Sequence, residues 1–316
     1  MEKTEALPES TPDKRQSIPL VEKPLFTARE PRFTLDRDVV LPASTRIQLE
    51  ECITKVDFHR QIYIEWGFEA VDPMGRSTIL NFYGPPGTGK TLAAEAFAGS
   101  LGMSVVSVGI AEVESKYMGE TSKNIQAVFR TARELDAVVF FDEADTLLGK
   151  RLSSVTQGID NEVNAMRSTL LIELERFDGI TIFATNFAKN YDEAFRSRIS
   201  HHVHFALPDF PARQGIWSRL LVAGIPLDGE RAELVARAAE LSEGMSGRDI
   251  RTCMRLALPK AILSGRQNGT PAKLSTQHIE GAINEVARAR REVASSNSLS
   301  ERNSVSDAKK LLGIES

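Results

Sequence analysis

The sequence predicts an α/β fold in which a doubly wound, parallel, five-stranded sheet is followed by a small all-helical domain. Three observations predict this fold. Five short segments, most of them continuously apolar, alternate with helical patterns, as expected of parallel strands that are covered on both faces. A glycine-rich loop joins the first of these segments to an alanine-rich helical pattern. From about residue 208 onward the strand patterns stop and only helical patterns continue.

Length and composition restrict the class of protein. The chain has 316 residues, of which 41% are hydrophobic and 26% are charged, as in ordinary globular proteins. Its net charge of -4 provides no bulk attraction for nucleic acid or an anionic membrane. We find neither a membrane-spanning apolar run nor a signal-peptide pattern. The two cysteines, Cys52 and Cys253, lack metal-binding spacing, so we expect core residues in a reducing cytoplasm.

We expect four regions along the chain. Residues 1–38 contain five prolines among polar residues, which predicts a disordered N-terminal tail. Residues 39–207 are expected to form the α/β domain and residues 208–292 the helical domain. Residues 293–316 are rich in serine and are expected to form a flexible C-terminal tail.

Each element of the two domains follows from its local pattern. The predicted strands are Thr78–Tyr83, Ser104–Val108, Ala137–Phe141, Ile180–Ala184 and His202–Phe205. The helices predicted between them are Lys90–Leu101, Lys123–Leu135, Asn161–Arg176 and Glu193–Ile199. In the second domain we expect four helices, within residues 212–224, 231–241, 247–258 and 276–292.

The first predicted strand runs into the sequence GPPGTGKT and then into a helix. This is the GxxxxGK[ST] pattern of a phosphate-binding loop, or P-loop, in its strand–loop–helix context. The glycines let backbone N–H groups turn toward phosphates, and the helix N-terminus adds its positive end. Lys90 would reach the β- and γ-phosphates and Thr91 would bind Mg²⁺. The residues expected to bind nucleotide here are Gly84, Pro85, Pro86, Gly87, Thr88, Gly89, Lys90, Thr91 and Leu92.

A second motif, VVFFDEAD, is acidic, and its Asp142 stands 52 residues after the P-loop lysine. Its four apolar residues predict a buried strand, and the carboxylates stand at the strand end where open α/β sheets bind ligands. Uncompensated acids there are costly, and Mg²⁺ would compensate Asp142. Glu143 is suited to hold or deprotonate an attacking water. Asp145 is open to a simpler interpretation as part of a helix N-cap.

GPPGTGKT followed by FFDEAD resembles the AAA ATPases, and the resemblance covers roughly residues 41–292. It implies ATP hydrolysis with Mg²⁺, a homo-oligomeric ring that is expected to be a hexamer, and work on a protein substrate. In AAA proteins the fourth strand ends in a polar residue that positions the attacking water. Asn186, which ends "ITIFATN", matches that position, although a turn-forming asparagine after a strand remains the alternative.

The resemblance also implies arginine fingers, which reach into the ATP site of the neighbouring subunit. Arg196 and Arg198 fall within the corresponding stretch, "YDEAFRSRISHHVHF", and Arg198 aligns best with the first finger. Where relatives commonly keep a second arginine, this chain has His201 or His202, which leaves the second finger open. Arg196 could equally lie on a solvated helix face.

"GMSGRDIRTCMRLAL" predicts a helix with Ser246 as its N-cap and Asp249 completing a capping box. Arg248 then lies in the first helical turn, where the helix dipole disfavours a cation. A cation that is unfavourable for helix stability at this place is more easily explained if Arg248 has a functional role. In AAA proteins with Ser-Gly-Arg at this place, the arginine senses the γ-phosphate. A surface arginine is the alternative.

The segment "SKYMGETSKN" places a tyrosine, a methionine and a glycine in a polar run. In AAA proteins the segment after the second strand is a loop in the central channel of the ring. The residues expected to grip a polypeptide there are Lys116, Tyr117, Met118 and Gly119. Tyr117 could instead fold onto its own domain. Residues 149–161 could form a second channel loop or an ordinary flexible loop.

The sequence favours an ATP-driven protein remodeller. The single ATPase module and Ser-Gly-Arg at the lid helix resemble the pachytene-checkpoint type of AAA ATPase, whose members convert HORMA-domain proteins between closed and open states. Bacterial members of that type act in antiphage defence. A general bacterial chaperone or activase would look similar. A nucleic-acid motor or loader is an alternative that the basic residues near 288–291 favour weakly, and a nucleotide switch is a third.

Overall fold

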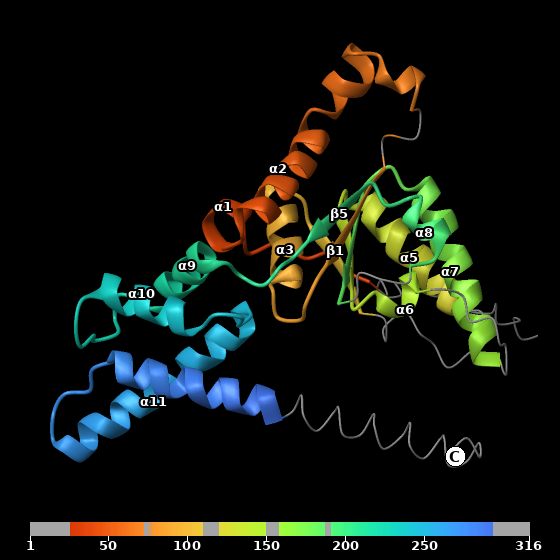
Figure 1. Cartoon of the computed structure of the whole chain (residues 1–316). Helices are drawn as coiled ribbons and strands as arrows, with labels where there is room; N and C mark the ends of the chain where they lie inside the picture. The colour runs from red at the N-terminus through yellow and green to blue at the C-terminus, as the bar shows by residue number, and fades with distance from the viewer. Residues whose placement is uncertain are drawn as a thin grey trace, which may run out of the picture.

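The structure is a computed structural model that describes residues 26–72, 75, 77–109, 120–149, 158–186 and 191–292. An α/β domain and a helical domain stand beside each other (Figure 1). The fold predicted from the sequence is confirmed. Within the described residues, no helix is long and apolar enough to cross a membrane.

The central sheet has five strands in the order β2-β3-β4-β1-β5, and all neighbouring strands are parallel. Every strand lies within one residue of its predicted position. The strands are β1 (Thr78–Tyr83), β2 (Val105–Gly109), β3 (Val138–Asp142), β4 (Ile180–Thr185) and β5 (His201–His204). Strands β3, β4 and β1 are neighbours and run parallel, so their carboxyl ends lie together at one edge of the sheet. The P-loop, Asp142 and Asn186 therefore come together there.

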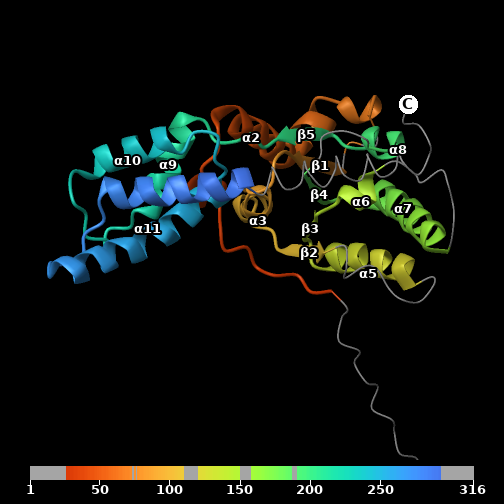
Figure 2. The same ribbon diagram turned by 60° about the horizontal axis from the view of Figure 1, so that its bottom comes forward.

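Helices cover both faces of the sheet (Figure 2). One face packs against α2 (Ala43–Asp57) and α3 (Lys90–Ser100). The other face packs against α5 (Glu120–Glu134), α6 (Asp145–Leu148), α7 (Gly158–Arg176) and α8 (Glu193–Arg196). Of these helices, α3, α5, α7 and α8 begin or end up to three residues from their predicted bounds, whereas α2 and α6 were not predicted. The strands are buried because both faces are covered, which accounts for their continuous apolar runs.

The helical domain consists of α9 (Phe210–Leu220), α10 (Arg231–Leu241), α11 (Gly247–Asn268) and a helix over residues 276–292. Its core surrounds Trp217, which is fully buried and donates a hydrogen bond from Nε1 to Ser242 Oγ at 2.9 Å. Helix α11 runs ten residues beyond the predicted residue 258, through an internal proline at Pro259.

Both cysteines are buried and free, as the sequence predicts for core residues. Burial raises the pKa of Cys52 and of Cys253 to about 12. Neither thiol is therefore a reactive thiolate near neutral pH.

The N-terminal segment, residues 26–38, differs from the predicted disordered tail. Arg29 exchanges two backbone hydrogen bonds of 2.9 Å with Val105 at the edge of the sheet. Phe26 and Leu35 are buried, and the short helix α1 (Leu35–Asp38) ends the segment. These contacts are long-range, so the local periodicity of the sequence does not predict them. The remainder of the predicted tail, residues 1–25, lies outside the described residues, as does the C-terminal tail, residues 293–316.

After α2, the chain forms an arm that the sequence analysis did not predict. It comprises residues 58–72 and contains a π-helical turn (Arg60–Glu65) and a 3₁₀ turn (Phe68–Ala70). The arm extends α2 away from the body of the molecule and then returns to β1 (Figure 1). Its base is held by ring contacts, because Tyr63 stacks on His59 with ring centroids 4.5 Å apart.

Candidate nucleotide site

The P-loop is built on glycines whose backbone other residues rarely adopt. Gly84, Gly87 and Gly89 have φ angles of 145°, 80° and 98°. A side chain at Gly84 would place its Cβ 2.2 Å from the Phe205 carbonyl oxygen. At Gly87 the added Cβ would lie 2.6 Å from Ser246 Oγ in the helical domain. Glycine is thus required both for the turn and for the close approach of the two domains.

Lys90 opens α3 and is buried at the centre of the loop. Its Nζ donates hydrogen bonds to the carbonyl oxygens of Gly84 at 2.7 Å and Pro85 at 3.0 Å, and to Asn186 Oδ1 at 3.0 Å. Burial lowers the pKa of Lys90, and the nearby positive charge of Arg248 acts in the same direction. The negative charges of Asp145 and Asp142 oppose this shift in the Lys90 pKa. The cation is therefore desolvated and pre-oriented, and a phosphate would relieve its burial.

Thr91 and Asp142 meet across the site, since Thr91 Oγ1 donates to Asp142 Oδ2 at 2.9 Å. A hydroxyl and a carboxylate oxygen are hard ligands of the kind that Mg²⁺ prefers. The two predicted metal ligands therefore fit a magnesium ion. Glu143, the next residue, is exposed and has a positive φ of 53°. Strained backbone of this kind in a non-glycine residue is common at functional sites.

Asp145 lies in the site as well, which the sequence left open. The backbone N–H of Asn186 donates to both Asp145 carboxylate oxygens, at 3.1 and 3.3 Å. The side chain of Asn186 at the same time accepts from Lys90. Asp145 therefore holds the Asn186 backbone beside the P-loop lysine. The sequence offered one signal for this role, the third acidic residue of the DEAD motif, but from the sequence alone a helix N-cap explains that residue equally well.

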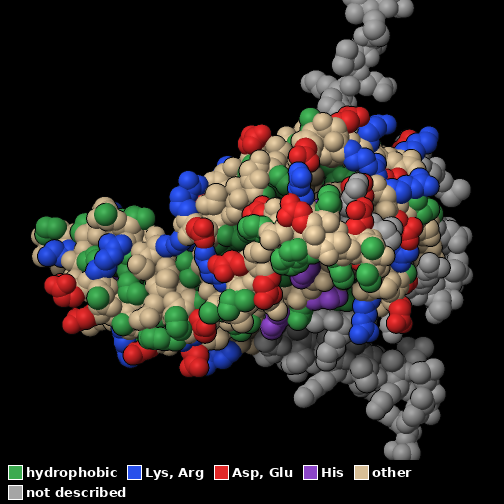
Figure 3. Space-filling model, turned by 90° about the horizontal axis from the view of Figure 1, so that it is seen from above, with side chains coloured by type: hydrophobic (Ala, Val, Ile, Leu, Met, Phe, Trp, Pro, Cys, Tyr) green, Lys and Arg blue, Asp and Glu red, His purple; other side chains and the backbone are tan. Residues whose placement is uncertain are grey.

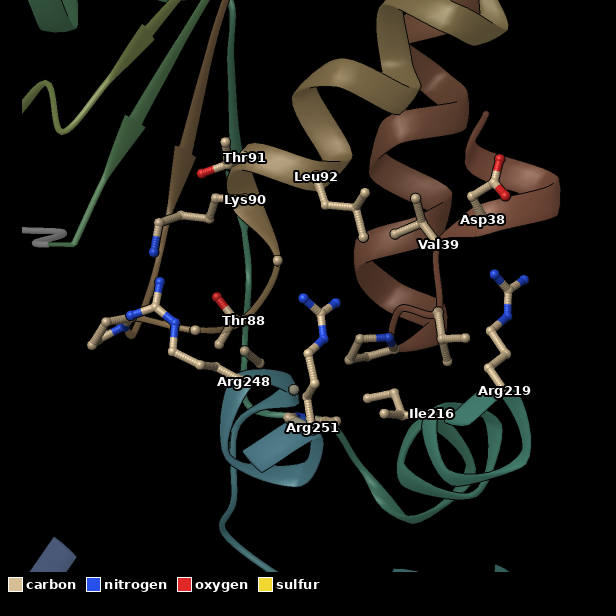
Figure 4. Close-up of a pocket in the computed structure, with 18 of the residues that line it drawn as sticks. Asp38, Val39, Thr88, Lys90, Thr91, Leu92, Ile216, Arg219, Arg248 and Arg251 are labelled. Carbon is tan, nitrogen blue, oxygen red and sulfur yellow. The ribbon is translucent and has the colours of Figure 1, made fainter. Parts of the chain in front are cut away.

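The helical domain closes over the P-loop through the start of α11. Ser246 and Asp249 form the predicted capping box, with Asp249 N donating to Ser246 Oγ at 3.3 Å and Ser246 N donating to Asp249 Oδ2 at 2.9 Å. The Arg248 backbone N–H donates to the Gly87 carbonyl oxygen at 3.1 Å. Figure 4 shows the Arg248 side chain rising from α11 toward the P-loop, on the same side as the Lys90 amine.

A cavity of about 420 Å³ lies between the two domains. It is lined by the P-loop and by the predicted residues Asp142, Glu143, Asn186 and Arg248. It is also lined by residues that the sequence analysis missed, within residues 38–42, α9 and α11. Val39 and Val40 form one apolar wall and Ile216 and Leu220 another, with Arg219 and Arg251 among the charged lining residues (Figure 4). The sequence offered one signal for this wall, the pair of valines before Pro42, but two valines alone do not indicate a binding site.

Arg196 and Arg198 lie outside this cavity. Arg198 Nε donates to Glu175 Oε1 at 3.1 Å, and its Nη1 donates to the Ala194 carbonyl oxygen at 2.7 Å. Arg196 is exposed at the end of α8. Helix α8 lies across the sheet from α9 and α11 in both ribbon views (Figures 1 and 2).

His201 and His202 lie on the edge strand β5. Burial lowers the pKa of both, and the charge of Arg196 adds to this effect at His202. The predicted channel-loop residues Lys116, Tyr117, Met118 and Gly119 fall outside the described residues. So do residues 150–157 of the possible second loop.

The fold and the site define a P-loop nucleotide-binding domain with a helical lid. The family of ATPases described as "ATPase family associated with various cellular activities (AAA)" matches residues 80–207 of the chain. Residues 80–207 therefore match an AAA ATPase domain, the class of enzyme domain that hydrolyses ATP with Mg²⁺.

Individual relatives agree with this assignment. Spastin of Drosophila mojavensis is 36% identical over 183 residues, which cover 54% of this chain and 23% of that protein. Spastin of Anopheles gambiae is 35% identical over 232 residues, which cover 68% of this chain and 27% of that protein. The chain therefore spans about a quarter of the length of the curated relatives it matches. The crystal structure of the FIGL-1 AAA domain shares the fold with a TM-score of 0.62 at 22% identity, covering 84% of this chain and 87% of that one.

Proposed function

We propose that this chain is an ATP-driven protein remodeller that works as a homo-oligomeric ring, with a hexamer as the expected size. One observation carries the proposal: Arg198 stands away from the cavity of its own chain, anchored by Glu175. An arginine that completes the ATP site of a neighbouring copy would occupy such a place. Arginine fingers of this kind increase rates by roughly 10³–10⁵ in other phosphoryl-transfer systems.

Within one copy the roles divide by position. Lys90 and the P-loop N–H groups would hold the phosphates, while Thr91 and Asp142 would hold Mg²⁺, which neutralises charge on the phosphates when it is bound. Glu143 is exposed at the cavity and would take the proton of the attacking water. Asn186, fixed by Asp145, would orient that water.

Arg248 would pass the state of the nucleotide to the lid. The Arg248 backbone is hydrogen-bonded to Gly87 of the P-loop, while its side chain lines the cavity. A change at the γ-phosphate would therefore act on the start of α11 and reorient the helical domain. In the ring, this movement would be transmitted to the channel residues Tyr117 and Met118, which would grip the substrate.

A finer proposal concerns the substrate. We propose that it is a HORMA-domain protein, converted between closed and open states in an antiphage signalling system in the cytoplasm. The support is the Ser246-Gly247-Arg248 sequence at the lid helix, which stands against the P-loop. A general chaperone or activase would use the same site on other substrates.

A nucleic-acid substrate receives little support. Arg288 lies 3.9 Å from Glu292, and Arg290 contacts Asp249 and the Gly244 carbonyl, so two members of the basic cluster are engaged within the lid. On the face shown in Figure 3, acidic and basic side chains are interspersed among the described residues. A continuous basic field, which nucleic-acid binding requires, is not seen there.

The test uses Glu143→Gln as bait, because this variant should bind ATP without hydrolysing it. The bait is added with ATP to lysate of the source cells, and the retained proteins are identified by mass spectrometry. The control carries Tyr117→Ala in addition. A protein held by the bait and lost from the control supports threading, and a HORMA-domain protein supports the finer proposal. If the bait retains nucleic acid, or if the bait and the Tyr117→Ala control retain the same protein, the threading mechanism is wrong.

A further inference from the structure

The tip of the arm exposes large apolar side chains. Ile64, Trp66, Phe68 and Val71 are 57%, 71%, 45% and 78% exposed, within a run of consecutive exposed residues. A cluster of this kind on a projecting element marks an interaction surface. Tryptophan is moreover the residue type most enriched among those that dominate binding energy.

The charge around this tip is mainly negative. Glu65 and Glu69 lie between the apolar residues, and both are exposed. Within residues 58–72, all of which are described, Arg60 is the one lysine or arginine, and it lies 3.6 Å from Glu65. A partner surface that fits the tip would therefore be apolar at its centre and basic at its edges.

Helix α11 of the lid carries such a surface. Ile262 and Leu263 are 56% and 55% exposed, and Arg255 and Arg266 flank them on the same helical face. Neither arginine has an ion-pair partner among the described residues. Helix α11 has one acidic residue, Asp249, which the capping box occupies. The face over residues 255–266 is thus the complement of the arm tip in charge and in hydrophobicity.

This face continues from the nucleotide cavity. Arg251, one helical turn before Arg255, lines the cavity between the domains. A neighbouring copy that brought Arg198 to the cavity would therefore cover the adjoining face of α11 as well.

The arm tip and α11 lie at different ends of the molecule. In Figures 1 and 2 the tip stands on the side of α8, whereas α11 lies on the opposite side of the α/β domain. They cannot meet within one chain, but they can meet between copies in a head-to-tail arrangement, which closes into a ring when the rotation from one copy to the next allows it. We propose that the arm tip of one copy docks on residues 255–266 of the next, as a second contact beside the ATP site. This inference rests on the proposed ring.

Cysteine cross-linking tests the contact directly. Full-length Trp66→Cys and Ile262→Cys chains, each also carrying Glu143→Gln, are mixed with ATP and treated with a mild oxidant. Both native cysteines are buried and have a raised pKa, so they should stay silent. The expected result is a cross-linked dimer in the mixture and none in either variant alone. The matched control replaces Ile262→Cys by Val222→Cys, which is equally exposed in the lid and should not cross-link.

The outcomes separate the inference from the proposed function. Rings observed by light scattering without the Trp66–Ile262 cross-link overturn the inference and leave the ring intact. Failure to form any ring overturns both. Rings that form normally with Trp66→Ala, but retain less substrate on the Glu143→Gln bait, assign the arm to substrate binding and also overturn the inference.

A second measurement gives the size of the contact. Trp66→Ala should raise the protein concentration at half-maximal ATPase activity by about 10- to 100-fold, as loss of an interface hot spot does. Trp66→Phe should restore most of the assembly, because it keeps an apolar ring. Val222→Ala, at a similarly exposed lid position, should leave this concentration unchanged. An unchanged concentration with Trp66→Ala contradicts the inference.

Discussion

At the scale of single residues, the nucleotide site depends on backbone positions that leave no room for a side chain. Gly87 has a positive φ, and a Cβ added there would lie 2.6 Å from Ser246 Oγ and 2.9 Å from Arg248 Cβ. A methyl group there would press against the start of the lid helix. The P-loop and Arg248 are therefore coupled by contact as well as by charge.

Gly87→Ala should accordingly lower the affinity for ATP by at least about tenfold, through backbone strain of about 1–2 kcal/mol and displacement of the lid. The measurement is titration with a fluorescent ATP analogue. Gly102→Ala is the matched control, because Gly102 also has a positive φ, of 69°, but no atom lies within 4 Å of its added Cβ. An ATP affinity for Gly87→Ala equal to that for Gly102→Ala would show that the contact with the lid has no role.

Asp145→Asn should lower kcat by about tenfold and leave KM for ATP nearly unchanged, because it weakens a charge-assisted hydrogen bond that fixes Asn186. Steady-state ATPase assays measure both constants. Asp178→Asn, at an exposed position just before β4, serves as the control and should have wild-type constants. A raised KM with normal kcat would instead place Asp145 in ground-state binding.

The residues of the site differ in how far the sequence predicts them. Lys90, Thr91 and Asp142 follow from motifs in which chemistry fixes both residue type and spacing. Asp145 and Asn186 are 41 residues apart in the chain, and they meet only because β3 and β4 end side by side. Val39 and Arg219 line the cavity through tertiary packing alone and belong to no motif.

At the scale of elements, the N-terminal segment is tied to α3 through one buried carboxylate. Glu95 accepts hydrogen bonds from Arg32 N at 3.1 Å and Arg32 Nε at 3.2 Å, and its other oxygen lies 3.5 Å from Arg29 Nη2. Burial acts to raise the pKa of Glu95, but the hydrogen bonds and charges of the two arginines outweigh it. The pKa is held below its ordinary value of 4.5.

Glu95→Gln should lower the free energy of unfolding near neutral pH by about 1–3 kcal/mol, because a charged, hydrogen-bonded partner is lost. The pH dependence has a definite sign. A lowered native pKa means that the unfolded chain binds the proton more tightly, so this contribution is complete above pH 4.5 and is lost as the pH falls through the native pKa. The difference between wild type and variant, measured by urea unfolding, should shrink below that pH.

Glu50→Gln is the control for this experiment. Glu50 pairs with Arg46 at 2.9 Å, but the Glu50 side chain is 58% exposed and the Arg46 side chain is 36% exposed, so the change should be below about 1 kcal/mol. A Glu95→Gln effect as small as this, or one that grows as the pH falls, would contradict the buried tie.

Strands and early helices differ sharply in how well the sequence predicts them. The strands β1 to β5 lie within a residue of their predicted places, because parallel strands buried on both faces need continuous apolar runs. Helix α2 was not predicted, and its buried residues are only Thr45, Leu49 and Cys52. A helix with so small a buried stripe is stabilised by where it packs, on β5 and the α3 face of the sheet.

At the scale of the whole molecule, the chain is asymmetric. Helix α11 lies on one side of the α/β domain, and helix α8 and the arm tip lie on the other (Figure 1). Residues of α11 line the cavity, and Arg198 follows the end of α8 by two residues. Each side carries what the other lacks. Head-to-tail association would satisfy both at once, and under the proposed function the ATP site is complete when such copies close into a ring.

The most direct test of this account mixes two inactive variants. Lys90→Ala removes the phosphate-binding cation but keeps Arg198, whereas Arg198→Ala keeps an intact P-loop. In a mixture of equal amounts, about a quarter of the sites should combine an intact P-loop with an intact arginine from the neighbour, and ATPase activity should reappear in that proportion. Mixing Lys90→Ala with Glu143→Gln, which lie in the same copy's site, provides the negative control, since Glu143→Gln pockets cannot be rescued by a neighbour. If the first mixture stays at the summed activity of its two components, Arg198 does not act across subunits and the central claim is wrong.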